Sequence, residues 1–181
     1  IRVYRGLQLQ LVVYMDAAME MLRGQHPKKE ILPGGILYYH IDDPVLESDT
    51  PLSDEEAEQA LLFALRPDGL VNSGEEIYRA MDQNFEGKSQ MIPVEIKKNG
   101  EISAARSKVA STEEFAVITR YVEHEIRQCG EAIYAGNIAV NPYRSDIETS
   151  CTYCPYGSVC GMDAKIPGYE YRQFASMKKE E

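Results

Sequence analysis

The chain has 181 residues, of which 44% are hydrophobic and 27% are charged, and its formal net charge is −10. This composition predicts a soluble globular protein, and a chain of this length buries about two-thirds of its unfolded surface. No apolar run approaches the roughly 20 residues that cross a bilayer, and no signal-peptide pattern opens the sequence. Clustered cysteines are typical of reducing compartments, so we predict a cytoplasmic location. The acidic balance does not favour nonspecific binding of nucleic acid by this chain alone.

A helix is predicted over residues 4–22, with Gly24 placed to end it. Its apolar residues recur at spacings of three and four: Leu7, Leu11, Tyr14, Ala18 and Leu22. Gln10 and Tyr14 are four residues apart and therefore share one face of this helix, where they form a Q-x3-Y pair. Taken alone, the pair fits either ordinary packing or a functional motif.

Residues 36–41 lie between a Pro-Gly-Gly and an Asp-Asp-Pro sequence, and their β-favouring side chains predict a buried strand. A helix followed by a strand predicts an α/β arrangement. His40 and Asp42 alternate onto one face of this strand. They fit either a pair of metal ligands or a strand-end histidine that is hydrogen-bonded into the fold.

Two short helices are predicted to begin at Ser53 and at Ser73, because each serine is followed three residues later by a glutamate, as in a capping box. Between them, the Pro-Asp-Gly sequence at residues 67–69 predicts a turn. Residues 91–96 resemble a strand, and the Asn-Gly pair at residues 99–100 predicts a tight turn after it. Together these two segments predict an exposed hairpin.

The longest predicted helix begins at Ser111, with Glu114 as its capping partner, and ends near Gly136. One apolar stripe runs along it, made of Phe115, Ile118, Val122, Ile126, Cys129 and Ile133. Because Cys129 belongs to this stripe, we interpret it as a small core residue rather than as a metal ligand.

Three further cysteines, Cys151, Cys154 and Cys160, form a C-x2-C-x5-C motif in a loop bent by Pro155 and Gly157. Thiolates this close together can all point at one metal centre, and soft sulfur suits zinc or an iron-sulfur cluster. Zinc sites and iron-sulfur clusters usually have four protein ligands, and this motif supplies three. The identity of the fourth donor therefore decides which metal group the site binds. The alternative is a set of cysteines that are merely reduced and buried.

Glu95-Ile96-Lys97 matches the E-x-K element of metal-dependent nucleases, in which a carboxylate binds Mg²⁺ and a lysine on the same strand face orients the attacking water. Three residues are an unspecific match, and charged pairs at the end of a hairpin strand are ordinary. The sequence contains no phosphate-binding loop of the G-x4-G-K-[ST] type, so this chain alone is not expected to hydrolyse ATP by that route.

The order of these motifs resembles the C-terminal nuclease region of the B subunits of bacterial AddAB helicase-nucleases. The matching segments are residues 6–11 with Tyr14, then 35–39, 68–71, 79–82, 136–138 and 141–143, and finally the cysteine motif. The resemblance implies a RecB-like nuclease of the PD-(D/E)XK class, with an α/β, restriction-endonuclease-like fold that this chain holds in part.

The resemblance also implies how the chain is organised. Residues 1–140 would form the C-terminal part of the nuclease domain, with inserted helices and a hairpin at 53–108, and residues 141–181 would form the cysteine-cluster loop and tail. Gln10 and Tyr14 would support the catalytic face. In that family the catalytic D/E-x-K element precedes the Q-x3-Y helix, so the triplet beginning at Glu95 would be a decoy. The Mg²⁺ ligands would then precede Ile1.

Cys151, Cys154 and Cys160 would match three ligands of a 4Fe-4S cluster, whose fourth cysteine comes from before the nuclease core and closes a very long loop. The piece alone, with three thiolates, would be expected to lose the cluster or to bind zinc with a histidine or water as fourth donor. We therefore expect a piece of an ATP-dependent helicase and exonuclease that resects double-stranded DNA breaks for recombinational repair. The piece itself would be inactive. Its partners would be DNA ends and the AddA subunit, reached through the longer protein, and its unpaired sheet edges would allow a homodimer. The alternative is a noncatalytic, metal-stapled module that binds protein or DNA.

Overall fold

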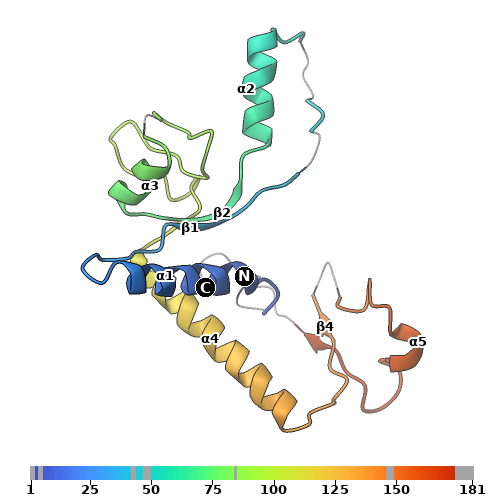
Figure 1. Ribbon diagram of the computed structural model, residues 1–181. Helices are drawn as coiled ribbons and strands as arrows, with labels where there is room; N and C mark the ends of the chain where they lie inside the picture. The colour runs from blue at the N-terminus through green and yellow to red at the C-terminus, as the bar shows by residue number, and fades with distance from the viewer. Residues whose placement is uncertain are drawn as a thin grey trace. The chain divides into compact units, whose positions relative to one another are not determined.

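The structure is a computed structural model that describes residues 3, 6–41, 44–46, 50–83, 85–145 and 149–173 (Figure 1). The chain divides into two compact units, Leu9–Glu123 and Ile1–Gln8 together with His124–Glu181. This division falls inside the longest helix, whereas the sequence predicted a boundary after residue 140. No helix among the described residues is long and apolar enough to cross a membrane.

A three-stranded mixed sheet organises the unit Leu9–Glu123. Strand β1 (Gly35–Tyr38) pairs antiparallel with β2 (Asp68–Asn72), and β2 pairs in parallel with β3 (Val109–Ala110), in the order β1-β2-β3. The helices that surround this sheet complete the predicted α/β arrangement, which is confirmed.

A very close approach between two strands is made at Gly69. Its φ of 153° suits glycine, and a Cβ there would overlap the carbonyl oxygen of Ile36 and lie 2.9 Å from the Cα of Leu37. Asp68 and Gly69 belong to β2, where they pair with Tyr38 and Leu37 of β1. The predicted turn at residues 67–69 is therefore wrong, because the glycine serves strand packing rather than chain reversal.

The main core lies on one side of the β1–β2 pair, where helix α3 (Glu75–Met81) packs against β2. Figure 1 shows α3 and helix α1 (Gln10–Gln25) on opposite sides of these strands. The buried members of this core are Val71, Tyr78, Phe85, Ile92, Val94 and Ile96. Three of them come from residues 91–96, so this segment belongs to the core and is not exposed as predicted, whereas the predicted turn at residues 99–100 forms between Ile96 and Ile102 and is exposed. Residues 91–96 form isolated bridges, such as Ile96 with Ile102, instead of the predicted strand.

Helix α1 (Gln10–Gln25) packs against β1 and buries Val12. It begins later than the predicted residue 4, and it extends past Gly24 to Gln25. Tyr4 lies outside the described residues. The helix and the Q-x3-Y pair on it are confirmed as structural features.

Two of the three helix starts predicted from capping boxes are confirmed. Helix α2 (Asp54–Ala64) begins after Ser53, which forms a complete capping box with Glu56. At α3 the predicted box at Ser73 is wrong, because the helix starts after Gly74 and has no side-chain cap. The amide of Gly74 instead donates to the side-chain oxygen of Asn72.

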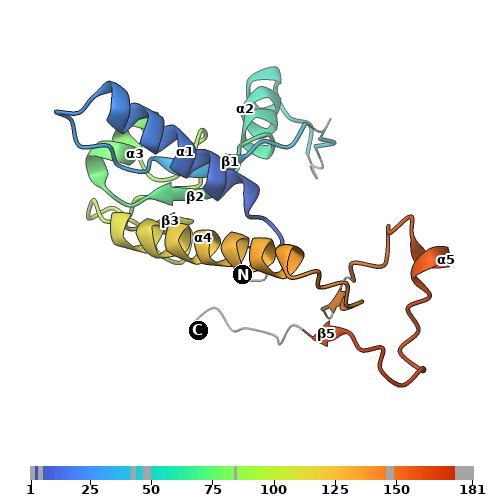
Figure 2. The ribbon, with the colours of Figure 1, turned by 60° about the horizontal axis from the view of Figure 1, so that its bottom comes forward.

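Helix α4 (Thr112–Tyr134) is the longest helix of the described chain (Figure 2). It begins with the predicted capping box, in which the Ser111 amide donates to Glu114 at 2.7 Å. Phe115 and Val122 are buried, whereas Ile126 and Ile133 are exposed. Cys129 is exposed too, so its predicted place in the core is wrong. Only the part of the apolar stripe that belongs to Leu9–Glu123 is covered.

Beyond the end of α4, the described residues of the other unit contain little regular structure. Two-residue strands β4 (Tyr143–Arg144) and β5 (Arg172–Gln173) pair in parallel, and one turn of helix forms α5 (Gly157–Cys160). None of its described residues is buried.

Candidate functional site

The Q-x3-Y pair lies at the start of α1. Gln10 Nε2 donates a hydrogen bond of 2.6 Å to the hydroxyl of Tyr14, one helical turn away. Both side chains are exposed, and Tyr14 retains 58% of its accessible surface. A tyrosine exposed to this extent is not a packed core residue, so the ordinary packing explanation for the pair does not hold within the described chain.

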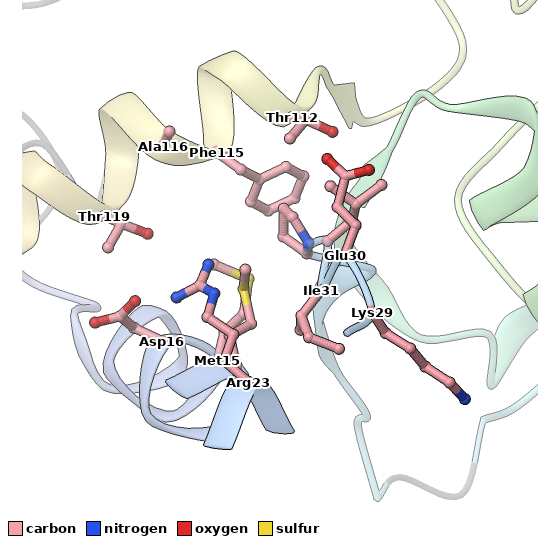
Figure 3. A pocket seen from close by; sticks show the side chains of 13 residues that line it. Met15, Asp16, Arg23, Lys29, Glu30, Ile31, Thr112, Phe115, Ala116 and Thr119 are labelled. Carbon is pink, nitrogen blue, oxygen red and sulfur yellow. The ribbon is translucent and has the colours of Figure 1, made fainter. Parts of the chain in front are cut away.

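A cavity of about 500 Å³ opens between α1, residues 29–33 and the first turns of α4. Figure 3 shows that the Phe115 ring faces this space and that the ammonium of Lys29 points away from it. A second hollow between α1 and β1 includes Tyr14 in its lining. The face of α1 that faces the sheet and α4 is therefore incompletely packed.

Asn72 fixes the start of α4 on the sheet. Its side-chain amide donates to the carbonyl of Pro33 at 2.8 Å and to the hydroxyl of Thr112 at 2.9 Å, and its oxygen accepts from Gly74. Asn72 is 1% exposed, so these bonds form in a site that water does not reach. The sequence analysis missed this residue, because an asparagine at the end of a strand reads as a turn residue.

The charged residues of the E-x-K triplet are each engaged locally. Glu95 forms an ion pair of 2.7 Å with Arg106, and Lys97 lies 3.8 Å from Glu101. Both acidic and basic groups are thus neutralised by neighbours within the same loop.

Of His40 and Asp42, the structure describes only the histidine. His40 is exposed and lies beyond the end of β1, and Asp42 lies outside the described residues. In the described part of the chain, no group of three or more His, Cys, Asp or Glu side chains is placed to hold a metal ion.

The three cysteines of the motif lie on turns around α5. Cys151 and Cys160 are half-buried and Cys154 is exposed, and none of them forms a disulfide. The amide of Cys154 donates to the carbonyl of Cys151 at 3.3 Å, and that of Cys160 donates to Tyr156 at 2.8 Å. Turns therefore keep the cysteines in one short loop, although their thiols do not converge on one point.

Cys151 has a partner that the sequence analysis missed. Interaction with the Cys151 side chain raises the pKa of the Tyr171 phenol above its ordinary value. The guanidinium of Arg144 lies 4.7 Å from the centre of the Tyr171 ring. No local signal predicts this contact, because the residues meet only through the two-residue strands β4 and β5.

The donor chemistry of the cysteine loop fits an iron-sulfur cluster. Such clusters are held by thiolates, and this loop offers three thiols that are not oxidised and not fully buried. Mg²⁺ requires oxygen ligands, and the described residues contain no acidic cluster that could supply them. The described chain therefore suits the cluster in ligand type and does not fit a Mg²⁺ site.

Comparison with known proteins places this chain among nucleases. The family model described as the PD-(D/E)XK nuclease superfamily matches residues 2–161. A relative from Thermoanaerobacter sp. (strain X514), named as the B subunit of an ATP-dependent helicase/deoxyribonuclease, is 39% identical over 179 residues. The match covers 99% of this chain and 15% of that protein.

Two proteins of the same name show the same level of similarity. The one from Lachnoclostridium phytofermentans is 39% identical over 187 residues, covering 98% of this chain and 16% of its own length. The one from Clostridium botulinum (strain Hall) is 39% identical over 179 residues, covering 99% of this chain and 16% of its own length. This chain thus spans 15% to 16% of the length of these curated relatives.

Proposed function

We propose a function for this chain from one premise: the chain belongs to the PD-(D/E)XK nuclease superfamily. It acts as the C-terminal part of the nuclease domain in the B-type chain of an ATP-dependent helicase and exonuclease. The larger protein resects double-stranded DNA breaks for recombinational repair. The observation that carries this proposal is 39% identity, over nearly the whole chain, to proteins named as helicase/deoxyribonuclease B subunits.

The partners follow from the same proposal. The larger protein binds double-stranded DNA ends and works with a second helicase-nuclease subunit of the AddA type. Strand β1 is an edge of the sheet, and further strands of the same polypeptide would add to it. In the isolated piece, β1 of a second copy would pair with this edge instead, and the result would be a homodimer. A noncatalytic module is not favoured, because the nuclease family match extends over most of the chain.

Gln10 and Tyr14 support the catalytic face in this proposal. The Tyr14 hydroxyl accepts from Gln10 and so holds the amide in one orientation on the exposed face of α1. The amide oxygen of Gln10 is then available to accept a hydrogen bond from a water molecule, and the second amide hydrogen can donate to a phosphate oxygen of DNA. Preoriented groups of this kind aid hydrolysis because they require no reorganisation as the reaction proceeds.

Mg²⁺ belongs to the proposal only at the level of the larger protein. Because the described residues do not fit a Mg²⁺ site, phosphodiester cleavage depends on ligands contributed from outside the described chain. This piece by itself is accordingly proposed to be inactive.

The cysteine loop is proposed to hold a 4Fe-4S cluster through Cys151, Cys154 and Cys160. When bound, the cluster supplies a covalent staple between distant parts of the chain. A physical need supports this role, because the described residues that surround the loop include no buried side chain to hold it folded. Small segments without a core are commonly stabilised by a metal or by disulfides, and none of these cysteines is in a disulfide.

The catalytic proposal is tested in the full-length protein, assembled with its AddA-type partner. Gln10→Ala should slow cleavage of double-stranded DNA ends on the order of 10²-fold, the usual effect of losing one preorganised hydrogen-bonding group. ATP hydrolysis and unwinding should stay unchanged, since no phosphate-binding loop lies in this chain. Gln25→Ala, at the other end of α1, is the matched control. Cleavage at the wild-type rate by Gln10→Ala would remove Gln10 from the catalytic face.

The cofactor proposal is tested by metal analysis of the same protein. We expect iron and acid-labile sulfide in wild type, and their loss in Cys154→Ser, whose side chain is exposed and has no packing role. Zinc without sulfide would instead indicate a structural metal module, and the 4Fe-4S assignment would be abandoned.

A further inference from the structure

We propose that Phe63, Arg66 and Lys88 form a contact site for the phosphodiester backbone of DNA. The inference rests on the proposed nuclease function and adds to it a DNA contact outside the pair of Gln10 and Tyr14. The three residues lie between β1 and β3, in a part of the chain that neither the Q-x3-Y pair nor the cysteine motif includes.

Two cations share one aromatic ring in this site. Phe63 lies in the last turn of α2, Arg66 follows that helix, and Lys88 lies in the loop after α3. The Lys88 ammonium lies 3.8 Å from the centre of the Phe63 ring, and the carbon of the Arg66 guanidinium lies 4.8 Å from it. The ring attracts both cations but neutralises neither, so two like charges are held close to one another, which costs free energy unless an anion joins them.

The neighbouring carboxylates are bound by other cations. Asp68 forms its ion pair with Lys108 at 2.6 Å. Glu95 is bridged to Lys88 through the backbone, but its carboxylate forms an ion pair with Arg106 at 2.7 Å. In the part of the chain that the structure describes, neither cation over the ring is in an ion pair. The positive charge of the site is therefore available to an external anion.

Arg66 is held in place and still has donors to offer. Its Nη1 donates to the carbonyl of Ser89 at 2.9 Å and to that of Ile92 at 3.3 Å. Its Nε and Nη2 donate to none of the described residues. A guanidinium presents its N–H groups as a planar fork that matches two oxygens of a phosphate. The bonds from Nη1 thus orient the remaining donors for such a group.

The site can be reached from solvent, because Lys88 is exposed and Phe63 retains 37% of its accessible surface. The acidic residues in the first turn of α2 lie at the other end of that helix. With a formal net charge of −10, the chain can attract DNA only where its cations are locally concentrated and not neutralised. Contacts to phosphates position a duplex without reading its sequence, which suits a protein that acts on DNA ends.

The contact is one of binding rather than of chemistry. Figure 1 shows α2 and α1 on opposite sides of the β1–β2 pair, so the site lies away from Gln10 and Tyr14 on α1. Loss of a charge there should weaken the binding of DNA and leave the cleavage step as it is.

The test uses the full-length protein, assembled with its AddA-type partner, and the variant Lys88→Gln, which removes one exposed cation. Binding of a double-stranded DNA end is measured over a series of salt concentrations. We expect weaker binding than in wild type. The slope of log affinity against log salt concentration should be less steep by about 0.9, the change for one lost phosphate contact on duplex DNA. The cleavage rate at saturating DNA should be that of wild type.

Lys98→Gln is the matched control, because Lys98 is also exposed and the substitution changes the net charge equally. It should leave the salt slope unchanged. Lys88→Arg keeps the charge and should keep the wild-type slope. Phe63→Leu removes the ring but leaves both cations, so it should weaken DNA binding less than Lys88→Gln does.

The outcomes separate this inference from the proposed function. A wild-type protein that neither binds nor cleaves DNA ends would overturn both. Normal binding by wild type, with the same salt slope in Lys88→Gln, would overturn the contact site alone, and so would an equal change of slope in Lys98→Gln. Weaker assembly of Lys88→Gln with the AddA-type subunit, at unchanged DNA affinity, would assign the three residues to a protein interface instead. A change of slope in Lys88→Gln that Lys98→Gln does not share would support the site, since a purely structural lysine would not alter the salt dependence.

Discussion

All the buried side chains of the described chain lie in Leu9–Glu123, and the described residues of the other unit contain none. The first unit is held by an apolar core under a sheet and by buried hydrogen bonds such as those of Asn72. The second is held by two-residue strands, turns and the contacts around Cys151. The helix α4 belongs to both, with buried residues in its first half and exposed apolar residues in its second.

The two units therefore depend on different forces. Burial of apolar surface stabilises the first unit. The described residues of the second unit show no comparable burial, which agrees with the proposal that a bound cluster stabilises the cysteine loop. Substitutions in the first unit should accordingly lower the unfolding free energy of the chain strongly. Equivalent substitutions in the second unit should change that free energy little.

The largest effect is expected for Gly69→Ala. The added Cβ would overlap the Ile36 carbonyl oxygen, and the φ of this residue is one that alanine rarely adopts. Because the backbone strain adds to the overpacking, we expect the unfolding free energy to fall by about 4 kcal/mol. Gly24→Ala in α1, where a Cβ meets nothing within 4 Å, should be neutral or slightly stabilising. Urea unfolding followed by circular dichroism measures both. Equal stabilities would mean that β1 and β2 do not approach as closely as described.

Phe115→Ala and Ile133→Ala compare the two halves of α4 directly. Phe115 is 1% exposed and beside a cavity, so its truncation should cost about 3 kcal/mol, the lower part of the range for a buried aromatic residue. Ile133 is 77% exposed, and its truncation should change stability by less than about 0.5 kcal/mol. A large loss for Ile133→Ala in the isolated chain would contradict the difference between the two units.

Asn72→Ala tests the polar part of the first unit. It leaves the Pro33 carbonyl and the Gly74 amide without their partner in a buried site, and should cost about 2 kcal/mol. The control is Asn99→Ala, because Asn99 bonds to Glu101 at an exposed turn, and we expect a change of at most about 0.5 kcal/mol. Thermal unfolding monitored in parallel would show whether the two asparagines differ as stated.

The smallest effect concerns the ion pair of Asp68 with Lys108, at 2.6 Å. The hydrogen bond from Lys108 lowers the pKa of the Asp68 carboxyl in the folded state. A lowered folded pKa stabilises the fold above the unfolded pKa of about 3.9, and the contribution is lost as the pH falls through the folded value.

Asp68→Asn should therefore cost at most about 1 kcal/mol at neutral pH, because the pair is largely exposed. The deficit should shrink as the pH falls below about 4 and vanish below the folded pKa. Lys108→Met should give the same deficit at neutral pH, and the double variant should add nothing further. A deficit in Asp68→Asn that persists unchanged at low pH would assign the effect to something other than the ion pair.

Features that depend on neighbours along the chain could be predicted from the amino-acid sequence alone. The capping boxes at Ser53 and Ser111 were predictable because a serine and a glutamate three residues later bond to each other's backbone within one turn. The helix carrying Gln10 and Tyr14 was predictable from its apolar periodicity. The order of motifs along the chain was sufficient to identify the nuclease superfamily.

Features that depend on residues far apart in the chain required the folded molecule. Gly69 reads locally as a turn and becomes a strand residue because β1 lies against it. Cys129 reads as part of an apolar stripe, yet it is exposed because only the first half of α4 is covered. Tyr171 reaches Cys151 through strands too short to give a periodic signal. Periodicity and capping act over one or two turns, whereas pairing and burial depend on which distant segment arrives beside a residue.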